Sequence, residues 1–250
     1  MLAMVLLELN VEFPANAMAW VEQGLRWLHF LAGITWIGML YYFNFVQTPF
    51  FATAEAPVRM GMLSGGLVAR ALWWFRWGAM FTFITGWLMI LYVMHDTGVR
   101  GFFNDAYGWK IFFGGMLGSL MWFNVWFIIW PAQQVLMASA TQVVKGGQAI
   151  PEAAARGQRA GWVSRTNVLL SIPMLFFMGA ARHLSMPGPA TRGAKIAALV
   201  LLIIVMAAAE YNATVGTAGA GKKLLGNLKH TFWAGFILTA ILYFGLIVIF

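Results

Sequence analysis

Long apolar runs alternate with short polar stretches along the chain. Six of these runs are close to the ~20 residues that a helix needs to cross a bilayer, and few charges interrupt them. We therefore predict an all-α integral membrane protein, a bundle of about six transmembrane helices. The predicted spans are residues 18–48, 66–94, 108–131, 162–182, 193–212 and 229–250.

The first 16 residues differ from the rest. They begin with an apolar stretch and then carry Glu8, Glu12 and Pro14, and no basic residue precedes the apolar part. A cleaved signal peptide has a basic n-region, so we predict instead an interfacial N-terminal segment over residues 1–16. Residues 17–250 are predicted to form a single transmembrane helical domain.

The first span carries a polar stripe around His29. On an α-helix, the other members of this stripe fall within about 60° of that histidine: Arg26, Gly33, Trp36, Leu40, Asn44 and Gln47. An ionisable residue inside a membrane segment indicates a functional site by default, and Gly33 would leave room beside the ring for a flat group. We predict that His29 is an axial haem ligand. The alternative is a structural histidine that hydrogen-bonds to another helix.

Composition narrows the candidate chemistry. The chain is 61% hydrophobic and only 10% charged, whereas soluble domains are about a quarter charged. It has no cysteine, which excludes disulfides, thiolate metal sites and a covalent c-type haem and leaves histidine as the strongest metal ligand. The net charge of +8 fits basic residues at cytoplasmic helix ends. We expect no nucleic-acid binding, because no basic run interleaves with aromatic residues.

The loop charges predict an orientation. Lys and Arg favour the loops after the first, third and fifth spans, which places both termini in the periplasm of a bacterial inner membrane. One group of side chains then reaches the periplasmic level: Arg26, His29, His95, Arg182 and His183. As the second haem ligand we favour His183 over His95, and for either the alternative is an ordinary interfacial histidine. The predicted haem site comprises His29, His183, His95, Arg26, Trp36 and Arg182, with His29 and His183 on the metal.

Two further segments are substrate-site candidates. Arg76 lies six residues beyond Arg70 in a tryptophan-rich stretch, so snorkelling to the interface explains Arg70 better than Arg76. Arg76 could serve an anionic substrate, a quinone headgroup or a haem propionate. Asn167 shares a helix face with Ser164 and Ser171, and either substrate binding or interhelical hydrogen bonding would explain that face.

Motifs of soluble enzymes are absent from the sequence. There is no G-x-S-x-G, no P-loop and no H-E-x-x-H, and no predicted span carries a pair of acids, since the acids within the spans are Glu22 and Glu210. Carboxylate-based proton pumping and metal-centred oxygenase chemistry are therefore not expected.

Three segments carry a family resemblance. His29–Gln47, Asn124–Gln133 and Arg165–Gly179 resemble the membrane domain of the PuuD-type urate hydroxylase/dehydrogenase (urate oxidase N-terminal domain) family. More loosely, the first span resembles the histidine-bearing helix of the HemJ and CopD membrane families, where such a histidine is associated with haem. Members of the first family typically carry a C-terminal cytochrome c domain, which this chain lacks.

The resemblance implies a place in purine degradation. The implied reaction oxidises urate to 5-hydroxyisourate at the membrane and passes electrons to cytochrome c. We therefore expect one or more b-type haems, urate as substrate, and a separate periplasmic c-type cytochrome as partner. The alternative is a non-catalytic haem-binding or structural subunit of a larger respiratory or photosynthetic complex.

Overall fold

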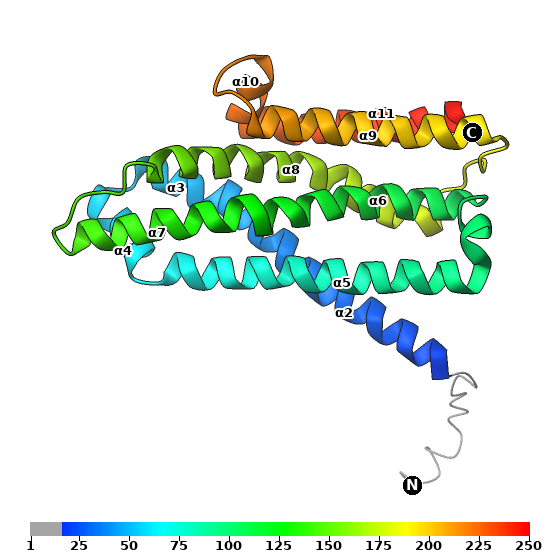
Figure 1. Ribbon diagram of the computed structural model, residues 1–250, viewed down its shortest axis with the longest axis horizontal. Coiled ribbons are helices and arrows are strands. Elements are labelled where there is room, and N and C mark those ends of the chain that lie inside the picture. Colours follow the sequence, from blue (N-terminus) through cyan, green and yellow to red (C-terminus); the bar gives the residue numbers. More distant parts are fainter. Residues whose placement is uncertain (1–16) are drawn as a thin grey trace, which may run out of the picture.

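The computed structural model describes residues 17–250, and all of its regular elements are helices. The predicted interfacial segment 1–16 lies outside the described residues. The helices follow one another in this order: α2 (Ala17–Tyr41), η1 (Tyr42–Gln47), α3 (Thr48–Thr53), α4 (Ala56–Ser64), α5 (Leu67–Phe102), α6 (Ala106–Phe123), η2 (Asn124–Ile129), α7 (Trp130–Val144), α8 (Ala153–His183), α9 (Arg192–Thr214), α10 (Ala220–Gly226) and α11 (Leu228–Ile249). Figure 1 shows them as one elongated bundle, in which the start of α2 and the C-terminus lie at the same end.

The all-α membrane bundle is confirmed. Within the described residues, five helical stretches are long and apolar enough to cross a membrane, so the chain is a multi-pass membrane protein. They begin at Leu67, Ala106, Ala153, Arg192 and Leu228 and correspond to the second to sixth predicted spans. The first predicted span is helical as α2 and η1 but does not belong to this set.

Two prolines do not end their helices as expected. The prediction closed the third span at Pro131, but the helix continues from α6 through η2 and α7 to Val144. Pro131 and Pro49 each stand at the second position of an α-helix that follows a π-helical segment. Proline lacks the N–H and crowds the carbonyl four residues earlier, so the chain widens there into a π turn instead of breaking.

Helix α8 is the centre of the bundle. Its buried residues range from Ala153 to Ala181, and it contacts α2, α6, α7, α9 and α11. By contrast, α9 buries only Ala198, Leu202 and Ala213 among its described residues and exposes Ile203 and Ile204. An apolar face without protein cover in a membrane protein is the face that lipid solvates.

Small residues bring α2 and α5 close together. A Cβ added at Gly78 of α5 would lie 3.0 Å from the backbone nitrogen of Trp36 on α2. Gly33 faces Thr82, whose Cγ2 would lie 3.9 Å from a Cβ at that glycine. The space that the sequence suggested beside Gly33 is therefore used for helix packing, the usual role of small residues between membrane helices.

Candidate functional site

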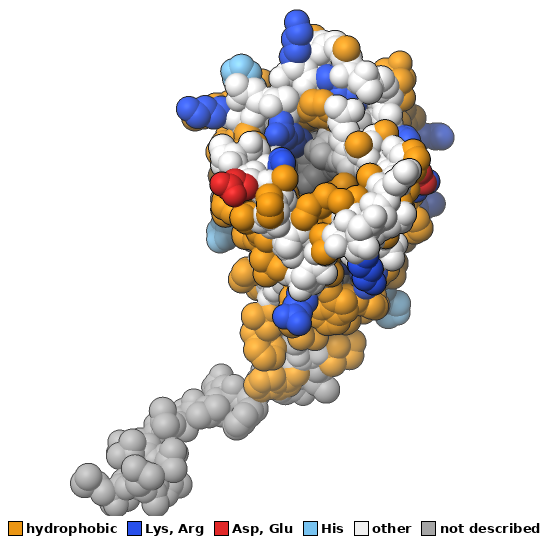
Figure 2. Space-filling view, turned by 90° about the vertical axis from the view of Figure 1, so that its left-hand side faces the viewer, with side chains coloured by type: hydrophobic (Ala, Val, Ile, Leu, Met, Phe, Trp, Pro, Cys, Tyr) orange, Lys and Arg blue, Asp and Glu red, His pale blue; other side chains and the backbone are white. Residues whose placement is uncertain are grey.

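A polar pocket opens at the end of the bundle opposite the C-terminus. Figure 2 looks at this end and shows a hollow surrounded by Lys and Arg side chains. The cavity has a volume of about 400 Å³, within the range of small-molecule sites. Its polar lining comes from three parts of the chain: Asn44, Gln47, Thr48, Gln133, Gln158, Ser164 and Arg165. Its apolar wall includes Phe43, Leu72, Phe75 and Trp162.

The two π-helical segments position the amides of this site. Asn44 and Gln47 lie within η1, and Asn124 opens η2 with Gln133 nine residues later. A π turn rotates the following residues relative to a regular helix, and such turns often occur at functional sites. Each segment thus supplies a buried asparagine toward α8, while the pocket-wall glutamines are Gln47 within η1 and Gln133 in α7, which follows η2.

Hydrogen bonds tie both segments to α8. Asn44 Nδ2 donates to Ser164 Oγ at 2.8 Å and to the Leu40 carbonyl at 2.9 Å. One turn deeper, the Tyr41 and Ser171 hydroxyl oxygens are 2.9 Å apart. These contacts form a polar floor that leads from the pocket into the bundle.

A second amide pair lies on the η2 side. Asn124 Nδ2 donates to Asn167 Oδ1 at 2.9 Å, and Asn167 Nδ2 donates to the Met121 carbonyl at 3.0 Å. Both asparagines are fully buried. Asn167 therefore acts between helices and does not line the pocket.

Arg165 links the pocket to α10. Its Nη1 donates to the carbonyls of Leu225 and Gly226, each at 2.6 Å, and so satisfies the end of that short helix. Arg165 also lines the cavity. Planar guanidinium groups bind anions with paired hydrogen bonds, which makes Arg165 the candidate anion-binding group of the pocket.

Lys222 adds positive charge next to Trp162, which lines the pocket. Its Nζ donates to the Ala213 carbonyl at 2.8 Å and lies 5.5 Å from the centroid of the Trp162 ring. Burial lowers the pKa of Lys222, and the neighbouring charge of Arg159 lowers it further. The pocket end is basic overall, with Arg59, Lys145, Arg156, Arg159, Lys222, Lys223 and Lys229 against Glu55 and Glu152.

His29 lies away from this pocket, between α2 and α5. Its Nδ1 is 3.1 Å from Thr85 Oγ1, whose own proton is donated to the Phe81 carbonyl at 2.6 Å. With the hydroxyl proton on that carbonyl, Nδ1 would donate to Thr85 Oγ1 and Nε2 would keep the lone pair. Gly86 makes room for the ring, because a Cβ there would lie 3.0 Å from His29 Cε1.

The other predicted haem residues are dispersed. His95 is exposed and lies ten residues beyond Thr85, about 15 Å farther along α5. His183 is exposed at the end of α8, and Arg182 beside it has its guanidinium 4.6 Å from the Tyr107 ring. The two remaining residues of the predicted haem site lie on α2. Arg26 forms an ion pair with Glu22, and Trp36 is buried with its Nε1 unpartnered.

Arg76 sits in an aromatic cage outside the pocket. Its guanidinium carbon lies 4.0 Å from the Trp130 ring and 5.1 Å from the Trp126 ring, and Trp126 Nε1 donates to the Arg76 carbonyl at 3.2 Å. These contacts hold the charge by cation–π attraction. Among the predicted substrate residues, neither Arg76 nor Asn167 lines the pocket.

Sequence reasoning missed the glutamines of the pocket wall. Gln47 was placed on the polar stripe of His29, and Gln133 and Gln158 were not singled out. The available signal was an amide two residues from a proline, because Gln47 precedes Pro49 and Gln133 follows Pro131 at the same spacing.

Comparison with known proteins gives one match. The urate oxidase N-terminal family model matches residues 98–245, from the end of α5 to the last turns of α11. No curated protein and no solved structure matches the chain. The family match covers more than half of the 250 residues, including Asn124, Gln133 and Arg165. The chain therefore belongs to the urate oxidase N-terminal family.

Proposed function

We propose that the polar pocket binds urate for oxidation. The observation that carries the proposal is the pairing of one guanidinium with three glutamine amides around a cavity of about 400 Å³. Urate is an anion at neutral pH with alternating N–H and C=O groups along its edges. Arginine suits the anion, and a side-chain amide presents a donor and an acceptor to one edge of a purine.

The aromatic wall suits a flat ligand. Phe43, Phe75 and Trp162 line the cavity. The Oε1 of Gln47 and the Nε1 of Trp162 are buried without a partner among the described residues. Buried polar atoms need partners, and a bound purine would supply both an N–H donor and a C=O acceptor.

The proposed reaction is hydroxylation by water. Urate and one water give 5-hydroxyisourate, two protons and two electrons, so the oxygen comes from water and the electrons go to an acceptor. We propose a periplasmic c-type cytochrome as that acceptor, in a bacterial inner membrane with both chain termini on the periplasmic side. Arg165 and the glutamines hold and orient urate, and the apolar wall excludes bulk water.

A b-type haem at His29 is part of this proposal. The imidazole is fixed through Nδ1, which leaves Nε2 as the ligand atom, the arrangement that orients metal-binding histidines in proteins. A haem bound there would supply one-electron transfer between the substrate and the cytochrome. The second axial ligand stays a prediction, with His183 favoured over His95.

Urate binding tests the pocket assignment. Gln133→Leu should weaken urate binding to the detergent-solubilised protein at least tenfold by calorimetry, because it removes both hydrogen bonds of the amide. Gln134→Leu is the matched control, since Gln134 is the exposed neighbour outside the cavity. Equal affinities in the two variants would refute the pocket assignment.

Turnover tests the reaction. Urate added anaerobically to the oxidised protein should reduce its haem, with or without a soluble cytochrome c. Urate binding without any reduction would instead favour the non-catalytic subunit, and co-migration with a large complex on a native gel would identify the assembly.

A further inference from the structure

Unpartnered polar atoms gather in the seam between α8 and α9. Nine buried side-chain nitrogen and oxygen atoms have no hydrogen-bond partner among the described residues, and five of them belong to four residues at this place. We call these four the α8–α9 seam: Asn124, Trp162, Thr166 and Glu210. Buried polar atoms are almost always paired with protein or with water, so a cluster of orphans indicates a site that holds water or protons.

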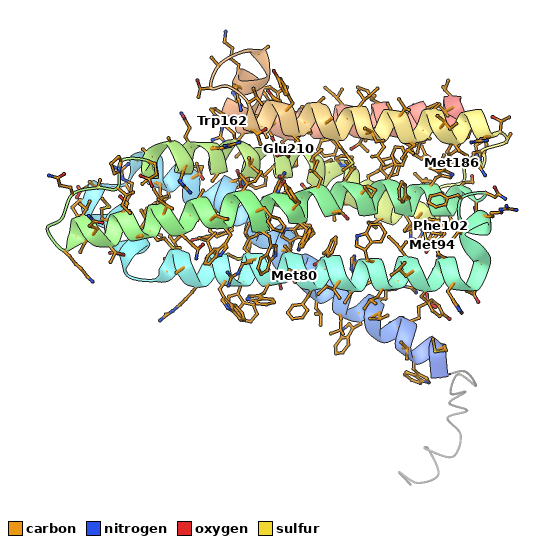
Figure 3. The ribbon with its side chains drawn as sticks, viewed as in Figure 1. Met80, Met94, Phe102, Trp162, Met186 and Glu210 are labelled. Atoms are coloured by element: carbon orange, nitrogen blue, oxygen red, sulfur yellow. The ribbon has the colours of Figure 1, made fainter. Side chains whose placement is uncertain are left out.

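The seam includes one residue of the pocket and one residue of the amide pair, Trp162 and Asn124. Trp162 lines the pocket, and Thr166 follows one helical turn later on α8. Glu210 of α9 points toward them from the facing helix, and Figure 3 shows Trp162 and Glu210 where α8 meets α9. The Glu210 carboxyl lies beside the Asn124 amide, although neither of its oxygens reaches hydrogen-bonding geometry.

Glu210 is the one enclosed carboxyl in the described part of the chain. The other acids there are exposed, apart from Glu22, which pairs with Arg26. Both Glu210 oxygens are shielded from solvent and lack an ion pair. An ionised carboxylate without a partner inside a membrane protein is costly, whereas the neutral acid is tolerated.

The orientation of the two asparagine amides shows that Asn124 Oδ1 lacks a hydrogen-bond donor. The Met121 carbonyl can only accept, so Asn167 must direct its Nδ2 there and its Oδ1 toward Asn124. Asn124 therefore gives its Nδ2 to Asn167, and its Oδ1 is left as an acceptor without a donor. A protonated Glu210 next to this amide, directly or through water, supplies that donor.

We propose that Glu210 is a protonated carboxylic acid at neutral pH and is the proton-binding group of a hydrated path along the α8–α9 seam. Glu210 releases its proton to water in the seam and takes one back from the same water. The charge that acts on Glu210 is that of Arg159 on α8. Helix α8 also carries Arg156 and Arg165, α10 carries Lys222 and Lys223, and Lys229 and His230 of α11 are exposed. Arg159 would stabilise the carboxylate that remains after release. The site does not depend on urate as the substrate.

Infrared spectroscopy of the full chain tests the proposal. At neutral pH the wild type should show the carbonyl stretch of a protonated carboxylic acid, and the band should shift in D2O. Glu210→Gln, a neutral variant of the same shape, should lack the band, while Glu152→Gln, at the exposed acid that precedes α8, should retain it. Absence of the band in the wild type, or its persistence in Glu210→Gln, would overturn the assignment.

Two further variants keep the test decisive if Glu210→Gln does not fold. Arg159→Gln should leave the wild-type band unchanged, whereas a stronger band would show that Glu210 had been ionised and stabilised by Arg159. Thr166→Val should slow the D2O-induced shift several-fold, because it removes a hydroxyl from the seam. An unchanged exchange rate would contradict the hydrated path.

Discussion

Asn44 and Ser164 are joined by a hydrogen bond of 2.8 Å between the amide Nδ2 of one and the hydroxyl of the other. The bond connects η1 to α8 at the floor of the pocket, across 120 residues of sequence. It explains why a π-helical segment is maintained at this point, since the segment directs the amide toward the central helix.

Loss of the Asn44 amide should destabilise the bundle. Asn44→Ala leaves the Leu40 carbonyl and Ser164 hydroxyl without their shared donor, so we expect a loss of ~1–3 kcal/mol in the free energy of unfolding. Thermal unfolding in detergent measures this loss, and Gln134→Ala on the exposed surface serves as the control. A variant as stable as the wild type would show that water replaces the bond.

The approach of α2 to α5 predicts opposite effects for two glycines. Gly78→Ala places a methyl group 3.0 Å from the Trp36 backbone nitrogen, so it should destabilise the protein by ~1–3 kcal/mol. Gly38→Ala meets no atom within 4 Å and should stabilise the helix by about 0.5–1 kcal/mol. Chemical or thermal unfolding of the two variants side by side tests the packing, and equal stabilities would contradict it.

His29 should govern haem binding. His29→Ala should abolish the haem absorption band of the purified protein, because it removes the proposed ligand atom. Thr85→Val should weaken haem binding by about 10- to 100-fold, since it removes the hydroxyl that orients the ring. His230→Ala, at an exposed position on α11, is the control. A low-spin spectrum that survives His29→Ala would assign the ligand to another residue.

Lys222 should make the stability of the folded protein vary with pH in the alkaline range. Its pKa in the folded protein is lowered by burial, so the folded state binds fewer protons than the unfolded state. Stability should therefore rise as the pH increases from the lowered pKa toward the ordinary lysine value of about 10.4. Over that range the melting temperature of the wild type should rise relative to that of Lys222→Met, which lacks the titrating group. Lys223→Met, at the exposed neighbour, should show no such trend.

Hydrophobicity alone predicted most of the fold. The five apolar runs from the second to the sixth predicted span became membrane-length helices, because in lipid only a helix satisfies its own backbone hydrogen bonds. Their bounds were less certain. The fourth span was predicted over residues 162–182, but the helix that forms it, α8, starts at Ala153.

The family could also be predicted from the sequence. The quoted segments around Asn124 and Arg165 fall inside the region that matches the urate oxidase N-terminal family. The haem ligands and the electron acceptor remain predictions, since they depend on groups that the chain itself does not contain.

The sequence by itself determined the helical membrane bundle, the absence of thiol chemistry and the residues available to a site. Only the tertiary structure decided which of these residues meet. Asn44 meets Ser164 and Asn124 meets Asn167 at the two π-helical segments that precede Pro49 and Pro131. Helical periodicity assumes 100° per residue, and a π turn breaks that assumption. For this reason the polar stripe around His29 divides into a histidine held by α5 and a pocket built around α8.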